Sequence, residues 1–145
     1  MKNEPSFEWN EELKMASCFL KDGQEVFVGF AQCHPEDMDM VTEKVGCEIA
    51  FYRAKIKFYQ SLKKDLKTAL YALNQLYYSM KHSKQFNENS YENHMLQRQI
   101  AIHETDLKTI KNLIKIEKEA LYKYIDEKDK FYKKIRSNRK KANKE

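Results

Sequence analysis

The chain is poor in the two residues that make tight turns, with 3 glycines and 2 prolines among 145 residues. A β-sandwich, a barrel or a parallel α/β fold needs a turn roughly every 8–12 residues, so this composition excludes them. No apolar run is long enough for a transmembrane helix, and the polar, acidic beginning predicts no signal peptide. The 3 cysteines therefore predict reduced thiols in the cytoplasm rather than a disulfide framework.

Charged residues are abundant, at 34% of the chain, and they are unevenly distributed. Residues 1–46 carry four basic and ten acidic side chains, a net charge of −6, whereas residues 47–145 carry +11. Residues 128–145 alone carry nine basic and two acidic side chains. The contrast favours contacts between copies or an anionic ligand on the basic part, although a lysine-rich helix is also an ordinary solvated surface.

Two long series of residues spaced three and four apart predict two long helices. The first series is Val41, Val45, Ile49, Tyr52, Ile56, Tyr59, Leu62, Leu66, Leu70, Leu73, Tyr77 and Met80. The second is Leu96, Ile100, His103, Leu107, Ile110, Ile114, Glu117, Leu121, Ile125, Lys128, Tyr132 and Ile135. We predict one domain over residues 1–145, mainly α with a small β head (an α+β fold), whose helices form an antiparallel two-helix coiled coil. The predicted boundaries are a helix over 36–82, a loop over 83–92, a helix over 93–136 and a disordered basic tail over 137–145.

Residues 1–35 are predicted to form the β head. Asp22 and Gly23 suit a tight turn between the alternating segments 13–20 and 25–33, which predicts a β-hairpin. Residues 1–12 are expected to be a loosely held arm or an edge segment. The apolar stripe of the first helix is wider than a two-stranded coiled coil requires, because Phe51 and Phe58 lie beside the main series. This width predicts a homodimer or a larger homo-oligomer.

Arg53 is the most suggestive residue for binding a ligand. Arginine binds phosphate through paired hydrogen bonds, and aromatic rings stack on bases. The candidate ligand-binding residues are Arg53, Lys57, Phe51, His34 and Phe86. The alternative is that Arg53 pairs with Glu43 or Glu48 and that the aromatic side chains belong to the core.

The sequence contains no recognisable catalytic arrangement. The four histidines are scattered, a glycine-rich phosphate loop is absent, and Cys33-His34 lacks the spacing of zinc ligands. We therefore expect no enzymatic activity, no metal and no cofactor.

Part of the chain resembles an amino-terminal signature of small phage and prophage proteins. A strand ending in G-x-A-x-C-H-P-x-D leads into a helix with G-x-x-x-A-x-x-R-A; the matching residues are Phe27–Asp37, Gly46, Ala50, Arg53 and Ala54. This layout is similar to the anti-Thoeris family of phage proteins that sequester signalling nucleotides. The resemblance covers residues 27–54, and it departs from the family where Met38 or Met40 stands in place of a common Phe.

The resemblance implies a function as well as a fold. It implies a small β head on a two-helix coiled coil, assembled as dimers or higher oligomers in the cytoplasm of an infected bacterium. Such a protein would bind cyclic ADP-ribose isomers or cyclic oligonucleotides without catalysis, with Arg53 as a phosphate partner.

Two other binding functions are open from the sequence, as is a purely structural role such as a virion or scaffold coiled coil. The acidic head, with Phe7 and Trp9, suits a protein-directed inhibitor that docks on a host defence nuclease, as anti-CRISPR proteins do. The basic run over residues 133–141 suits non-specific binding of nucleic acid. No membrane partner is expected.

Overall fold

The computed structural model describes residues 4–144, which fall into two compact units. One unit comprises Met1–Phe58 and Lys115–Glu145, of which residues 1–3 and 145 lie outside the described part. The other comprises Tyr59–Ile114. Both long helices pass through both units, so each unit is described on its own below.

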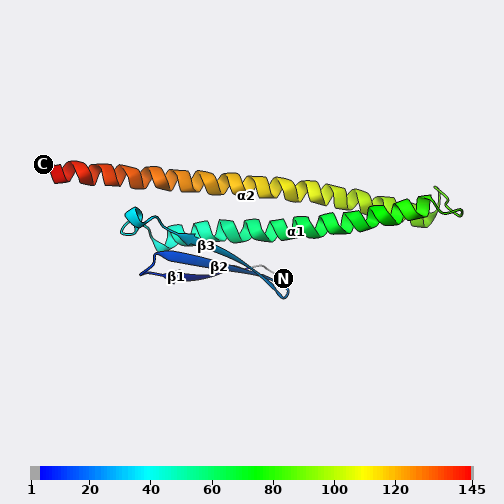
Figure 1. Ribbon diagram of the computed structural model, residues 1–145, viewed down its shortest axis with the longest axis horizontal. Coiled ribbons are helices and arrows are strands. Elements are labelled where there is room, and N and C mark those ends of the chain that lie inside the picture. Colours follow the sequence, from blue (N-terminus) through cyan, green and yellow to red (C-terminus); the bar gives the residue numbers. More distant parts are fainter. Residues whose placement is uncertain (1–3, 145) are drawn as a thin grey trace. The chain divides into compact units, whose positions relative to one another are not determined.

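Residues 4–144 form three strands followed by two long helices (Figure 1). The elements are β1 (Ser6–Asn10), β2 (Met15–Asp22), β3 (Glu25–Gln32), the short 3-10 helix η1 (Pro35–Asp37), α1 (Glu43–Lys81) and α2 (Tyr91–Lys144). This confirms the predicted mainly α fold with a small β head.

The head is a three-stranded antiparallel sheet in the order β1-β2-β3. The predicted hairpin is confirmed as β2 and β3, and Gly23 supplies the left-handed residue of its turn at φ +62°. The amino-terminal segment is an edge strand, because β1 pairs with β2 from Ser6 opposite Phe19 to Asn10 opposite Met15. Of the two alternatives predicted for residues 1–12, the edge segment is confirmed for residues 6–10 and the loosely held arm is wrong there; residues 1–3 lie outside the described part.

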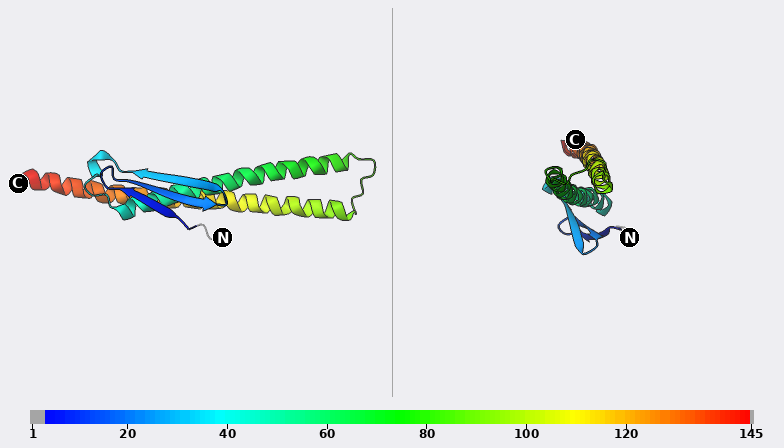
Figure 2. Two further views of the ribbon diagram at one scale, coloured as in Figure 1. Left: turned by 90° about the horizontal axis from the view of Figure 1, so that it is seen from below. Right: turned by 90° about the vertical axis from the view of Figure 1, so that its right-hand side faces the viewer.

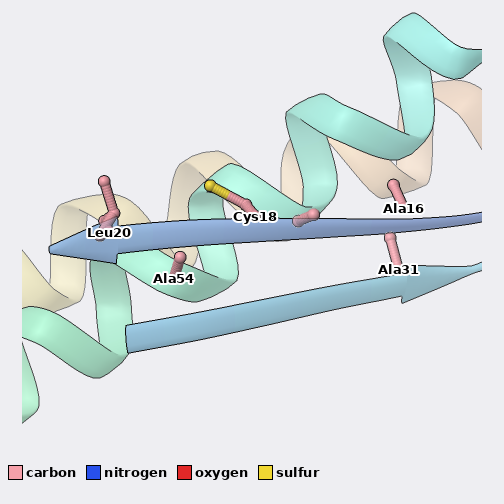
Figure 3. Close-up of a cluster of buried hydrophobic side chains, with 6 residues drawn as sticks. Ala16, Cys18, Leu20, Ala31 and Ala54 are labelled. Carbon is pink, nitrogen blue, oxygen red and sulfur yellow. The ribbon is translucent and has the colours of Figure 1, made fainter. Parts of the chain in front are cut away.

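One face of the sheet packs on the beginning of α1, and in this unit α1 lies between the sheet and α2 (Figure 2). The packing surface is made of small side chains, which allows the strands to come close to the helix (Figure 3). The buried cluster contains Ala16, Cys18, Leu20, Ala31, Ala50 and Ala54. Gly29 makes the closest approach: a Cβ there would be 2.0 Å from the Ala50 carbonyl oxygen and 2.5 Å from the Ala54 nitrogen.

The sheet also accounts for the wide apolar stripe of α1. Phe51 meets Phe7 of β1 edge to face at 6.1 Å between ring centres, and Phe58 meets Phe27 of β3 at 5.4 Å. These two side chains predicted a partner copy, but they contact the chain's own sheet. The width of the stripe is therefore no longer evidence for an oligomer.

The two predicted helical series are confirmed, because every position in both is buried or half-buried. In the first unit the two helices meet through Tyr52 and Tyr124, whose ring centres are 6.1 Å apart, and through a Lys55–Glu117 ion pair of 3.0 Å. The ion pair explains how Glu117 can occupy a position of the series. In the second unit α1 ends at Lys81, and α2 begins at Tyr91 after the connecting segment 82–90.

The start predicted for the first helix is wrong: α1 begins at Glu43 rather than at residue 36. The Nδ1 atom of His34 accepts a hydrogen bond from the backbone N–H of Glu36 (3.2 Å) and caps the separate η1 turn. Thr42 then caps the start of α1, because its Oγ1 accepts a hydrogen bond from the N–H of Val45 (3.4 Å).

The prediction of a disordered tail over residues 137–145 is wrong for residues 137–144, which continue α2 as a helix. Two ion pairs hold this end of α2 to the segment that precedes α1. Arg136 pairs with Asp37, and Arg139 pairs with Asp39. The partners are 99 and 100 residues apart along the chain, so the pattern of neighbouring residues carries no sign of them.

Replacing Gly29 by alanine tests the close approach between β3 and α1. The added methyl group would collide with backbone atoms that cannot rotate away, so we expect Gly29→Ala to lower the free energy of unfolding by about 3 kcal/mol. Urea denaturation measures it. Gly23→Asn is the matched control, because nothing lies within 4 Å of that site and asparagine tolerates positive φ. Equal stability of Gly29→Ala and the natural protein would contradict this packing.

Candidate ligand-binding site

A pocket of about 140 Å³ lies in the first unit, where the end of β3, the beginning of α1 and the second half of α2 meet. Its walls are largely apolar. The apolar and small residues that line it are Ala31, Val41, Val45, Gly46, Ile49, Ile125 and Tyr132. An apolar enclosure with a few polar groups is the usual form of a small-molecule site.

The polar residues of the pocket come from five segments of the chain. They are Lys14, Gln32, Cys33, His34, Asp37, Arg53, Lys128 and Asp129. Lys14 reaches the pocket from the β1–β2 turn, where its φ of 48° is left-handed. Arg53 belongs to α1. Lys128 belongs to α2, where its side chain is half-buried. The fold thus gathers groups that are up to 115 residues apart, from Lys14 to Asp129.

Some of these charges already have partners. Asp37 is buried, at 6% exposure, and pairs with Arg136, while Lys14 pairs with Glu11. Burial of a carboxylate is costly unless an opposite charge is close, so the Arg136 guanidinium offsets the cost of burying the Asp37 side chain.

Arg53 and Lys128 differ from those residues, because within residues 4–144 no carboxylate oxygen lies within 4.0 Å of either one. Arg53 donates from Nη1 to the backbone carbonyl of Phe30 (2.7 Å), and the Lys128 Nζ lies 5.5 Å from the ring centre of Tyr124. Both partners are neutral. The pocket therefore holds two positive charges that an anion can still neutralise, beside two acidic groups, Asp37, which pairs with Arg136, and Asp129.

Two further groups of the pocket are neutral at ordinary pH. Burial raises the pKa of the Cys33 thiol, and the nearby Asp37 charge raises it further. Burial also raises the pKa of the Tyr132 phenol, and the charge of Asp37 adds to this effect. A protonated thiol is a poor nucleophile. The pocket therefore offers cations and neutral donors above an apolar floor.

The structure brings together two of the five predicted binding residues, because Arg53 and His34 both line the pocket. Lys57 donates from Nζ to the carbonyl of Val28 (2.7 Å), and Phe51 packs against the sheet, so neither is among the lining residues. Phe86 belongs to the second unit. The alternative in which Arg53 pairs with Glu43 or Glu48 is wrong, since its partner is the Phe30 carbonyl.

Arg53 and Lys57 share a structural task at the edge of the sheet. In the β2–β3 hairpin Val28 and Phe30 are at positions whose carbonyl groups point away from β2. The two long side chains of α1 satisfy these carbonyl groups. They thereby block an edge on which another strand would otherwise pair.

Sequence reasoning missed Lys14, Lys128 and Tyr132 as site residues. Lys128 and Tyr132 do appear in the second helical series, where the spacing predicts packing and nothing more. A lysine at such a position was an available signal, because a buried lysine stem needs somewhere to place its ammonium group.

A wider depression borders the pocket. It measures about 610 Å³ and is lined by Leu13, Gln32, Cys33, His34, Pro35 and Met38. Three of these residues, Gln32, Cys33 and His34, also line the pocket. A ligand larger than the pocket has room to extend along this strand end.

Comparison with known proteins identifies no relative: no protein-family model, curated protein or solved structure matches the chain. Among residues 4–144, no cluster of three or more histidine, cysteine, aspartate or glutamate residues is arranged to hold a metal ion. None of the helices in this part of the chain is long and apolar enough to cross a bilayer. The case for a function therefore depends on the residues of the pocket.

The two arginines that hold the end of α2 are expected to contribute differently to the free energy of unfolding. Arg136→Gln leaves the buried Asp37 without its guanidinium, and we expect it to cost about 2–3 kcal/mol of unfolding free energy. Arg139→Gln removes an exposed pair with Asp39 and should leave stability unchanged within experimental error. Urea denaturation of the two variants measures the difference.

The double variant Asp37→Asn with Arg136→Gln is the control for this comparison. It removes both charges, so it should recover part of the stability that Arg136→Gln loses. If Arg136→Gln and Arg139→Gln unfold at the same urea concentration, the Asp37–Arg136 pair does not hold the end of α2.

Proposed function

We propose that this protein binds and sequesters a cyclic signalling nucleotide, a cyclic ADP-ribose isomer or a cyclic oligonucleotide, without catalysing a reaction. The observation that carries the proposal is the pocket in which Arg53 and Lys128 have no acidic partner. The resemblance of residues 27–54 to the anti-Thoeris family supports the choice of ligand. It also supports the setting, a phage counter-defence protein in the cytoplasm of the bacterial host.

The pocket suits the parts of such a ligand. A phosphate group would replace the missing counterion of Arg53 and Lys128, and charge-assisted hydrogen bonds of this kind are the strong ones. A base or sugar would lie on the apolar walls, where Tyr132 and Cys33 are available as neutral donors. His34 stands at the edge of both the pocket and the neighbouring depression.

The size of the pocket shapes the proposal. Sites for drug-sized ligands measure roughly 300–1,000 Å³, and this pocket measures about 140 Å³. One copy therefore encloses a phosphate and part of its nucleoside, and the rest extends along the depression at residues 32–34. Sequestration needs nanomolar affinity, about −12 kcal/mol, so we include in the proposal a second copy that covers the open side in a homodimer or larger assembly.

The protein-directed alternative loses part of its basis. Trp9 is half-buried, because it packs over Gly46 and against the buried cluster, so only part of its ring is available to dock on a nuclease. Phe7, at 42% exposure, is still accessible. The pocket is a more specific feature than exposed rings such as Phe7 and Phe30 of the head, and it favours the small ligand.

Isothermal titration calorimetry with cyclic ADP-ribose isomers and cyclic oligonucleotides tests the proposal. We expect one of them to bind the natural protein, and Arg53→Gln and Lys128→Gln each to weaken it by about 10–100-fold, the value of a charged hydrogen bond. Lys57→Gln is the matched control. Lys57 caps a β3 carbonyl as Arg53 does but does not line the pocket, so this variant should bind within about twofold of the natural protein.

Alkylation of Cys33 gives a second readout. A bound ligand should slow its reaction with a maleimide while leaving Cys47, which is not a lining residue, unaffected. Absence of heat with every nucleotide would refute the proposed function. Equal losses in Lys57→Gln and Arg53→Gln would show that Arg53 acts through the sheet edge and not on the ligand, and a monomer mass by light scattering with ligand present would refute the covering second copy.

A further inference from the structure

At the end of α2, the arginines and the lysines have different surroundings. Arg136 and Arg139 turn toward the head and pair with Asp37 and Asp39. The lysines of the same turns are exposed. They are Lys130, Lys133, Lys134, Lys140, Lys141 and Lys144. The basic segment is thus a structured helix with its arginines engaged and its lysines on the outside, a division that the run of charges along the chain does not show.

These lysines form a continuous surface, which we call the lysine face. Residues 130–144 contain no acidic residue, and Lys130 alone among the six has an ion-pair partner in the described chain, Asp126 at 3.0 Å. A helix of this length extends about 21 Å. Neighbouring phosphates on one strand of duplex DNA are about 3.4 Å apart along the axis, so the lysine face can follow about six of them.

We propose that the lysine face is a docking surface for the phosphate backbone of double-stranded nucleic acid, bound without regard to sequence. Charge complementarity carries the assignment: five unpaired ammonium groups on one rigid helix face a polymer with a regular array of negative charge. None of these lysines lines the pocket, so this inference does not depend on the proposed function.

The composition of the helix favours nucleic acid over an anionic membrane. A helix that lies in a bilayer interface buries a broad apolar face between its basic residues. In residues 130–144 Tyr132 is buried and Ile135 is half-buried, which leaves Phe131, at 57% exposure, as the single exposed aromatic side chain. Reading of bases is not expected, because lysine is a point charge and the two arginines, which could contact guanine through two hydrogen bonds, already have partners.

Fluorescence anisotropy with a labelled 20-base-pair duplex of arbitrary sequence tests the inference on the full chain. Five phosphate contacts predict a slope of about −4.5 in a plot of log affinity against log salt, a loss of about 500-fold between 50 and 200 mM salt. The variant with Lys133, Lys134, Lys140, Lys141 and Lys144 all changed to glutamine should bring the slope above about −1. A second variant with Lys63, Lys64, Lys67, Lys81 and Lys84 changed to glutamine has the same net charge and should keep the slope of the natural protein.

Helix content by circular dichroism should be unchanged in both variants, since glutamine favours helices as lysine does. If both variants lose binding equally, net charge and not the lysine face holds the duplex, and the inference is overturned. It is also overturned if the natural protein fails to bind the duplex at 50 mM salt, whether or not it binds phosphatidylserine vesicles. Loss of duplex binding with nucleotide affinity retained would separate this surface from the pocket.

Discussion

The contact between Gly29 of β3 and the backbone of α1 is the constraint on which the head depends. The strand comes within reach of the helix because Ala50 and Ala54 present almost no side chain at the crossing. A lone hairpin is barely stable in water, and here the close packing supplies the missing apolar burial. The same approach places the outer edge of β3 beside α1, where Arg53 and Lys57 cap its carbonyl groups.

Some of the opposite charges of the head and the helices form ion pairs within the chain. The acidic segment after β3 and the basic end of α2 meet through Asp37, Asp39, Arg136 and Arg139. Hydrogen bonding to Arg139 lowers the pKa of Asp39, so this carboxylate stays charged through the ordinary pH range. These pairs hold the last turns of α2 to the segment that precedes α1.

The basic side chains that form no ion pair within residues 4–144 are the ones that suit an external anion. Arg53 and Lys128 have only neutral contacts, and they stand in an enclosure with apolar walls, which suits a small anion. The lysines beyond residue 130 stand on an open helix, which suits an extended polyanion. An enclosed pair of charges and an open row of charges therefore select ligands of different size, although both select for phosphate.

The sequence by itself determined the helical series, since each of their positions is buried or half-buried, and the turn at Asp22-Gly23, since both signals depend on residues a few positions apart. The resemblance of residues 27–54 also marked Gly29, Ala50 and Ala54, the small residues at the crossing. Only the tertiary structure decided that residues 6–10 form a strand, that α1 begins at Glu43, that residues 137–144 are helical, and that Arg53 shares a pocket with Lys14, Lys128 and Tyr132. The reason is physical. The ion pairs and the pocket join residues about 100 positions apart, and the spacing of neighbouring residues does not indicate which distant groups come into contact.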